Sequence, residues 1–113
     1  MSRMGKPAAQ QPAPSPAPPP AEKIPAIAVG RRPTMNYVLA AMLALQQGDG
    51  WLVVKARGRA INKAVSVVQI LKNRFFKGLQ VVEVKLGSEE RAGQDGRTRT
   101  VSTMEILVRR GAA

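Results

Sequence analysis

The sequence contains no cysteine and no histidine among its 113 residues. Without cysteine, the chain can form neither a disulfide framework nor a zinc site with thiolate ligands. Without histidine, it lacks the residue that most often acts as a general base or binds a metal. Acidic residues are also few, 7 against 18 lysines and arginines, so the net charge is +11. We therefore expect no catalytic residue, no metal and no cofactor, and the charge favours a polyanionic partner.

Long apolar segments are missing as well. The longest apolar run in the body of the chain, residues 37–45, has nine residues, fewer than the ~20 that a membrane-spanning helix needs. No apolar segment follows the basic start of the chain, as a secretory signal would require. We therefore expect a cytoplasmic protein that does not enter a membrane.

Proline is distributed unevenly, with eight of the nine prolines in residues 1–25. Proline at this density fixes the backbone angle φ and removes hydrogen-bond donors. The composition predicts an extended, disordered tail over residues 1–23 and one folded domain over residues 24–113. A Pro-x-x-Pro ligand for a partner is the alternative interpretation of the tail. The tail carries a net charge of +2, which leaves +9 on the folded domain.

The apolar pattern of the domain alternates between strand and helix periods. It predicts strands over residues 24–29 and 51–56, helices over 34–47 and 60–74, and a final hairpin of strands over 79–86 and 98–108. The first helix is apolar over most of its circumference, so we expect it to be buried on more than one side. The core stripe of the second helix is predicted to contain Ala64, Val68, Leu71 and Phe75. The order βαβαββ predicts an α/β two-layer sandwich on a mixed sheet.

Basic residues gather at the first two connections between these elements. Arg31 and Arg32 separate the first strand from the first helix. Arg57, Arg59 and Lys63 surround the start of the second helix, where the helix dipole is already positive and an acidic residue would be more stabilising. Cations there suit a phosphate that docks on the free N–H groups of the helix. The alternative is an ordinary solvated helix start.

A third basic segment lies between the last two strands. The predicted loop over residues 87–100 is longer than the ~2–5 residues usual for a hairpin. Asp95-Gly96 fits a tight turn, so the strands can continue beyond the domain as a two-stranded arm that carries Arg91, Arg97 and Arg99. A basic ribbon suits the major groove of DNA, and single arginines suit a narrow minor groove. A flexible solvated loop is the alternative.

These segments carry a resemblance to a known family. The run GRRPTMNYVLAAMLALQQGDGWLVVKARGRAINKAV, then NRF and QDGRTRTVSTMEILVR, resembles the archaeal Alba chromatin proteins over residues 24–110. The resemblance implies a βαβαββ fold like the C-terminal domain of translation initiation factor three. It also implies a homodimer, or a heterodimer with a paralogue, that binds double-stranded DNA and RNA without sequence preference. Such a protein coats, compacts or bridges DNA and is associated with the nucleoid.

The resemblance also implies roles for individual residues. It places nucleic-acid contacts at Arg31, Arg32, Asn36, Tyr37, Arg57, Arg59, Lys63, Arg91, Arg97 and Arg99. Phe75 matches an aromatic residue through which neighbouring dimers associate along DNA, although it also falls on the predicted core stripe. Family members that are regulated by acetylation have two lysines at the position of Arg31 and Arg32, so that regulation is not expected here.

Two other functions fit the same pattern. The first is an RNA-binding protein that helps to assemble ribonucleoproteins with the same fold, through 2′-hydroxyl and phosphate contacts. The second is an architectural oligomerisation module whose charge only keeps it soluble. A nuclease is the most distant alternative, because the sequence offers no histidine and no pair of acids for the chemistry.

Overall fold

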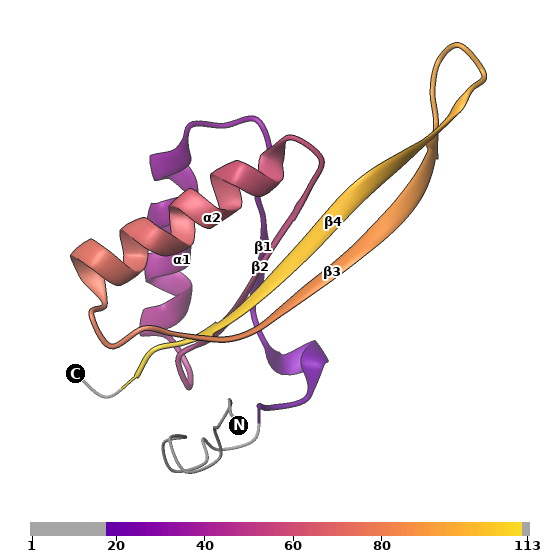
Figure 1. The fold of residues 1–113 in the computed structure, drawn as a ribbon. Coiled ribbons are helices and arrows are strands. Elements are labelled where there is room, and N and C mark those ends of the chain that lie inside the picture. Colours follow the sequence, from indigo (N-terminus) through magenta and orange to yellow (C-terminus); the bar gives the residue numbers. More distant parts are fainter. Residues whose placement is uncertain (1–17, 112–113) are drawn as a thin grey trace, which may run out of the picture.

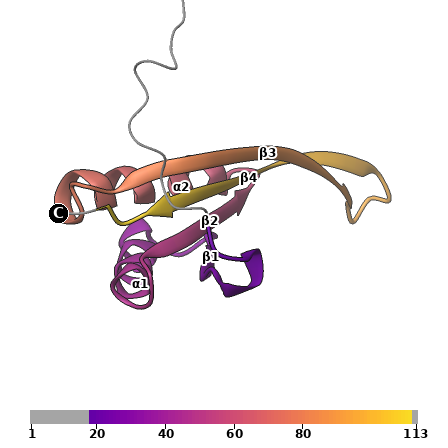
Figure 2. The same cartoon turned by 90° about the horizontal axis from the view of Figure 1, so that it is seen from below.

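The computed structural model describes residues 18–111 and forms a four-stranded sheet with two helices on one face (Figures 1 and 2). This is the predicted α/β two-layer sandwich with the order βαβαββ. The elements are η2 (Ala21–Lys23), β1 (Ala26–Ala28), α1 (Thr34–Gln46), β2 (Trp51–Arg57), α2 (Ala60–Ile70), η3 (Leu71–Phe75), β3 (Gln80–Ala92) and β4 (Thr98–Arg109).

The order of the strands across the sheet is β1-β2-β4-β3. β1 runs parallel to β2, and β4 runs antiparallel to both β2 and β3. The C-terminal ends of β1, β2 and β3 therefore lie at the same end of the sheet as the start of β4. The topology thus brings the β1–α1 connection, the start of α2 and the β3–β4 connection to one end of the molecule.

The hydrophobic core lies between the helices and the inner face of the sheet. Alternate residues of β2 point to opposite faces, so Leu52 and Val54 are fully buried against the helices. On the outer face, Trp51 is also buried, and the guanidinium carbon of Arg109 lies 5.7 Å from its ring centroid. The other fully buried large side chains come from both helices, the turn that follows α2, and β4: Val38, Leu45, Val67, Leu71 and Val108.

Helix α1 is buried on one side only, so the expectation of burial on several sides is wrong for the single chain. Met35, Leu39 and Leu43 follow one another at helical spacing and are 51–59% exposed. The reason is the two-layer architecture: within residues 18–111, α1 packs against the sheet, α2 and η3, all on one side of the helix. An apolar stripe therefore remains on the outside of α1.

The second helix ends differently from the prediction, because α2 is followed by one π-helical turn, η3. The Phe76 N–H donates to the Leu71 carbonyl, five residues earlier, over 2.7 Å. This wider turn shifts the following side chains relative to the helical stripe. Phe76 packs against the core, whereas Phe75 is 44% exposed. The placement of Phe75 in the core stripe is therefore wrong.

The predicted long loop is largely strand. β3 and β4 pair as far as Ala92 and Thr98, so that only residues 93–97 connect them. β2 pairs with β4 no farther than Thr103, and residues 88–102 therefore form a two-stranded ribbon, which we call the arm. Figure 1 shows the arm projecting beyond the helices, as the arm interpretation of the sequence predicted. Its turn uses the expected pair: Asp95 Oδ1 accepts a hydrogen bond from the Arg97 N–H over 3.0 Å, and Gly96 has a φ of 80°.

The first strand is shorter than predicted, since β1 contains only Ala26–Ala28. Residues 21–23, which were expected to belong to an extended tail, form the 3₁₀ turn η2. In the rest of the predicted tail, residues 18–20 have no regular secondary structure, and residues 1–17 lie outside the described residues, as do residues 112 and 113. Within residues 18–111, no helix is long and apolar enough to cross a membrane.

Candidate nucleic-acid interface

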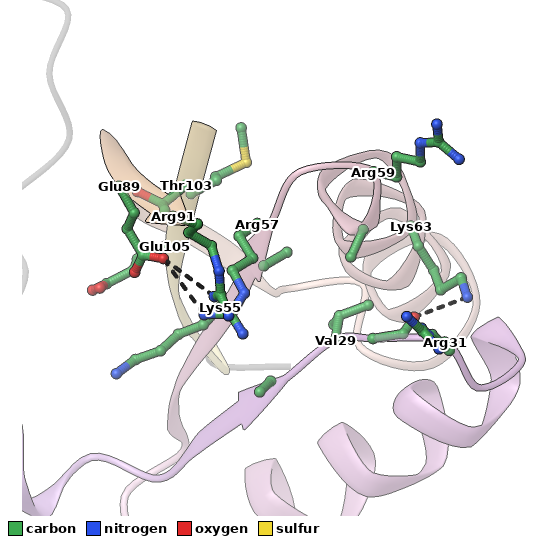
Figure 3. Close-up of a pocket in the computed structure, with 15 residues that line it drawn as sticks. Val29, Arg31, Lys55, Arg57, Arg59, Lys63, Glu89, Arg91, Thr103 and Glu105 are labelled. Atoms are coloured by element: carbon green, nitrogen blue, oxygen red, sulfur yellow. Dashed lines mark hydrogen bonds and ion pairs between the residues drawn. The ribbon is translucent and has the colours of Figure 1, made fainter. Parts of the chain in front are cut away.

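A basic pocket of about 1060 Å³ lies at the end of the sheet from which the arm projects. It lies between the β1–α1 connection, the end of β2, the start of α2 and the base of the arm (Figure 3). Two carboxylates, Glu89 and Glu105, also line it, so that cations outnumber anions three to one. The six cationic residues of the lining are Arg31, Lys55, Arg57, Arg59, Lys63 and Arg91.

Two of the predicted contact residues hold the β1–α1 connection in place. Lys63 Nζ donates to the carbonyls of Gly30, over 3.0 Å, and of Arg32, over 2.7 Å. The Tyr37 hydroxyl accepts a hydrogen bond from the Arg32 N–H over 3.0 Å. Together these contacts fix the backbone that carries the exposed Arg31 and Arg32 beside the start of α2. The third proton of the Lys63 ammonium is still available for a ligand.

The start of α2 has the electrostatic character that the sequence predicted. Its first turn contains no acidic residue, and no side chain caps it. Gly58 precedes it with a φ of 58°, a conformation that favours glycine. The Gly58 N–H donates to the Ser102 carbonyl of β4 over 2.8 Å, which ties this turn to the base of the arm. The positive end of the helix dipole is therefore open, with the exposed Arg59 beside it.

A carboxylate links two of the pocket arginines. Glu89 Oε1 lies 3.5 Å from Arg57 Nη1 and 3.7 Å from Arg91 Nη1. Figure 3 shows the three side chains pointing toward one another on one side of the pocket, with Lys63 and Arg31 on the other side. In the sequence, Glu89 is one of the acidic residues of the predicted loop over residues 87–100. Nothing in its local sequence indicated a contact with Arg57, which is 32 residues away.

The pocket does not contain all of the predicted residues. Asn36 is exposed in the first turn of α1. Arg97 and Arg99 lie farther out along the arm, where Arg99 is directly opposite Arg91 in the β3–β4 ladder. Like charges opposite one another destabilise a strand pair, so this placement favours an external anion.

Sequence reasoning missed Lys55 as a pocket residue. Lys55 precedes Arg57 by two positions on β2, so both side chains lie on the same face of the strand. The spacing of two residues from Arg57 could have identified Lys55 from the sequence. Across the sheet, Lys55 is paired in register with Glu105, which is in turn paired with Lys85. Glu105 therefore lies in register between two lysines, whereas Glu83 lies opposite Leu107.

Comparisons with known proteins identify the same family that the sequence resembles. The Alba family model matches residues 26–88. Among solved structures, Alba from Thermoplasma volcanium is 37% identical, with a TM-score of 0.68, and the match covers 75% of this chain and 99% of that one. ALBA1 from Trypanosoma brucei is 28% identical, with a TM-score of 0.61, and the match covers 76% of this chain and 68% of that one. The segment matched by the family model includes most of the basic pocket but ends before the arginines of the arm.

Proposed function

The chain belongs to the Alba family, whose members are non-enzymatic nucleic-acid-binding proteins and typically dimers, and from this premise we propose that it binds double-stranded DNA as a dimer without sequence preference. In this proposal the protein coats, compacts or bridges DNA and is associated with the chromosome. It also binds RNA.

The observation that carries the proposal is the basic pocket. Six cationic side chains from four parts of the fold line it, against two carboxylates. Phosphate contacts by such groups fix the position of a protein on a duplex but carry no sequence information. The open start of α2 adds N–H donors to the same place. Arg31, Arg32, Arg57, Arg59 and Lys63 of each subunit are the proposed phosphate contacts, with Asn36 and Tyr37 beside them.

The arm supports an extended contact. It is a solvent-exposed ribbon that projects from the end of the sheet where the basic pocket lies (Figure 1). In the proposal, the two arms of a dimer follow the duplex on either side, and arginine side chains enter the minor groove, whose narrow form attracts them. Arg91, Arg97 and Arg99 are the arm residues that make these contacts.

Exposed apolar residues of β3 support the dimer. β3 is an edge strand of the sheet, and Val81, Val84 and Leu86 on its helix-side face are 45%, 48% and 74% exposed. A long edge strand with an apolar face is a liability unless something covers it. A second copy of the chain, or a paralogue, is the proposed cover. The exposed Phe75 lies apart from this strand, in η3, and is the proposed contact between neighbouring dimers along DNA.

The salt dependence of binding to random-sequence duplex tests the proposal. If roughly eight phosphates are neutralised per dimer, the logarithm of the affinity falls with the logarithm of salt concentration at a slope of about −7. Fluorescence polarisation of a labelled duplex at a series of salt concentrations measures the slope. A slope near zero would contradict the proposal, because an oligomerisation module with no nucleic-acid site predicts that result.

Two controls sharpen this measurement. Alanine at both Arg57 and Arg59 should weaken binding to the same extent on duplexes of different sequence, whereas a loss confined to one sequence points to base recognition. Competition with structured RNA at the same salt concentration ranks the two nucleic acids. Tighter binding to RNA would favour the ribonucleoprotein alternative.

A further inference from the structure

We propose that Glu89 occupies the place of a nucleic-acid phosphate in the free protein and thereby limits the affinity of the basic pocket. The inference rests on the proposed function, because it concerns the same pocket. It assigns to Glu89, which lines the pocket, the role of lowering the affinity for nucleic acid.

The contacts of Glu89 are those expected of an anionic ligand. A single carboxylate oxygen, Oε1, lies between the guanidinium groups of Arg57 and Arg91, at 3.5 and 3.7 Å from their Nη1 atoms. The two arginines come from different strands, β2 and β3. A phosphate oxygen carries the same charge and accepts hydrogen bonds from guanidinium groups in the same way. The carboxylate therefore occupies a position that suits a phosphate oxygen of the duplex.

The fold does not need this carboxylate. The side chains of Glu89, Arg57 and Arg91 are 47%, 56% and 49% exposed, and exposed ion pairs contribute little to stability. β3 is held to β4 by the ladder in which Glu89 faces Val101. Within residues 18–111 these two ion pairs are the only ones present. Among these residues, the acid that forms ion pairs, Glu89, thus lies inside the pocket that six cationic residues line.

The carboxylate has two opposite effects on binding. It aligns the two guanidinium groups toward one point, which favours a ligand, and it occupies that point, which opposes one. The alignment is weak, because both contacts are solvent-exposed and longer than 3.4 Å. A phosphate can reach this point only after the carboxylate has left it, and the two guanidinium groups then lose their contacts with Glu89. The net effect of Glu89 is therefore to weaken binding.

A pair of matched substitutions tests this inference. Glu89→Gln keeps the size of the side chain and removes its charge. Glu90→Gln makes the same change in net charge one residue later, on the opposite face of the ribbon. We expect Glu89→Gln to tighten binding of random-sequence duplex by about three- to tenfold at ~0.1 M salt. Glu90→Gln should change binding by less than about twofold.

Two results of this comparison would overturn the inference. Equal gains in the two variants would mean that only the net charge matters. Weaker binding by Glu89→Gln would mean that the alignment of the arginines dominates. Circular dichroism and the mass in solution of both variants, compared with those of the wild type, show that each variant is folded and assembled like the parent.

The arginine partners provide a second test. In a chain that already carries Arg57→Gln and Arg91→Gln, Glu89→Gln should gain no more than Glu90→Gln does. A gain that persists undiminished would show that the carboxylate does not act through these arginines, and would overturn the inference. Failure of the proposed function is seen separately, as a flat salt dependence of the wild type. A steep wild-type slope with no difference between the two glutamine variants would refute only the role of Glu89.

Discussion

The side chain of Lys63 joins two parts of the basic pocket that are far apart in the sequence. Its ammonium binds carbonyls that are 33 and 31 residues earlier, in the β1–α1 connection. The Tyr37 hydroxyl holds the same connection through the Arg32 N–H. The backbone of Arg31 and Arg32 is therefore held by α2, although this connection leads from β1 into α1. Lys63 positions other cations as well as contributing its own charge.

Lys63→Met should lower stability as well as binding. It removes two hydrogen bonds from a charged donor, and we expect the free energy of unfolding to fall by about 1–2 kcal/mol. Thermal unfolding measures this loss, and faster hydrogen exchange of the Arg32 amide locates it. Lys72→Met is the control, because Lys72 is exposed in η3 and the change in charge is the same. Equal stability of the two variants would contradict the positioning role.

At the scale of single residues, the sequence predicted where most of the pocket would form but not how its members interact. The dipole argument placed Arg57, Arg59 and Lys63 around the start of a helix. Arg59 and Lys63 lie there, whereas Arg57 ends β2 and its guanidinium lies beside Glu89. The contacts of Lys63 with carbonyls and of Glu89 with arginines join distant segments. Such contacts depend on strand register and loop path, which the local pattern of residues does not determine.

At the scale of elements, the arm differs from every other part of the fold because it has no core beneath it. Within the described residues, its two strands are exposed along their length, and only Val101 and Gly93 are partly covered. Backbone hydrogen bonds and the Asp95-Gly96 turn hold it together. The arm therefore presents arginines far from the pocket without adding to the stability of the domain.

Replacing residues 90–100 by Asn-Gly should remove the outer part of the arm and leave the domain intact. The new turn would join Glu89 to Val101, which already face one another in the ladder, and Asn-Gly suits a two-residue hairpin. We expect an unchanged melting temperature, weaker duplex binding and a salt slope shallower by about 2. The triple variant Arg91→Gln, Arg97→Gln, Arg99→Gln keeps the ribbon and tests charge alone. Unchanged affinity in the shortened chain would show that the arm does not contact the duplex.

The elements that the sequence predicted well are those with a buried face. Helix α1 and strand β2 agree with the prediction to within one residue, because burial imposes a period on their apolar residues. The outer half of β3 was expected to be a loop, because its polar residues have no buried face and therefore no apolar alternation. The π-helical turn η3 was missed for another reason: it changes the period within a helix, so that Phe76 rather than Phe75 reaches the core.

At the scale of the whole molecule, residues 18–111 leave two apolar surfaces of several residues uncovered in the single chain. One is the helix-side face of β3, and the other is the stripe of Met35, Leu39 and Leu43 on α1. The sequence indicated that α1 was apolar nearly all round, but it could not distinguish burial within one chain from burial between chains. The two surfaces lie on different elements, so separate substitutions can test them.

Leu86→Lys should convert the proposed dimer to a folded monomer. Leu86 is 74% exposed in the single chain, so the change removes little from the core, whereas burial of a leucine in an interface contributes about 1.5–3 kcal/mol per copy. Sedimentation velocity should show half the mass, with an unchanged circular dichroism spectrum. Leu39→Lys, on the stripe of α1, should leave the dimer intact. A dimeric Leu86→Lys variant would place the interface elsewhere.

The position of Trp51 has a practical consequence for optical measurements on this protein. It is the only tryptophan of the sequence, and it is buried at the start of β2, while Arg57 ends the same strand beside the pocket. Strand geometry separates the two ends by about 20 Å. Intrinsic tryptophan emission therefore reports whether the sheet is intact and does not respond to occupancy of the pocket. The polarisation of a labelled duplex reports binding, so folding and binding can be followed independently in one sample.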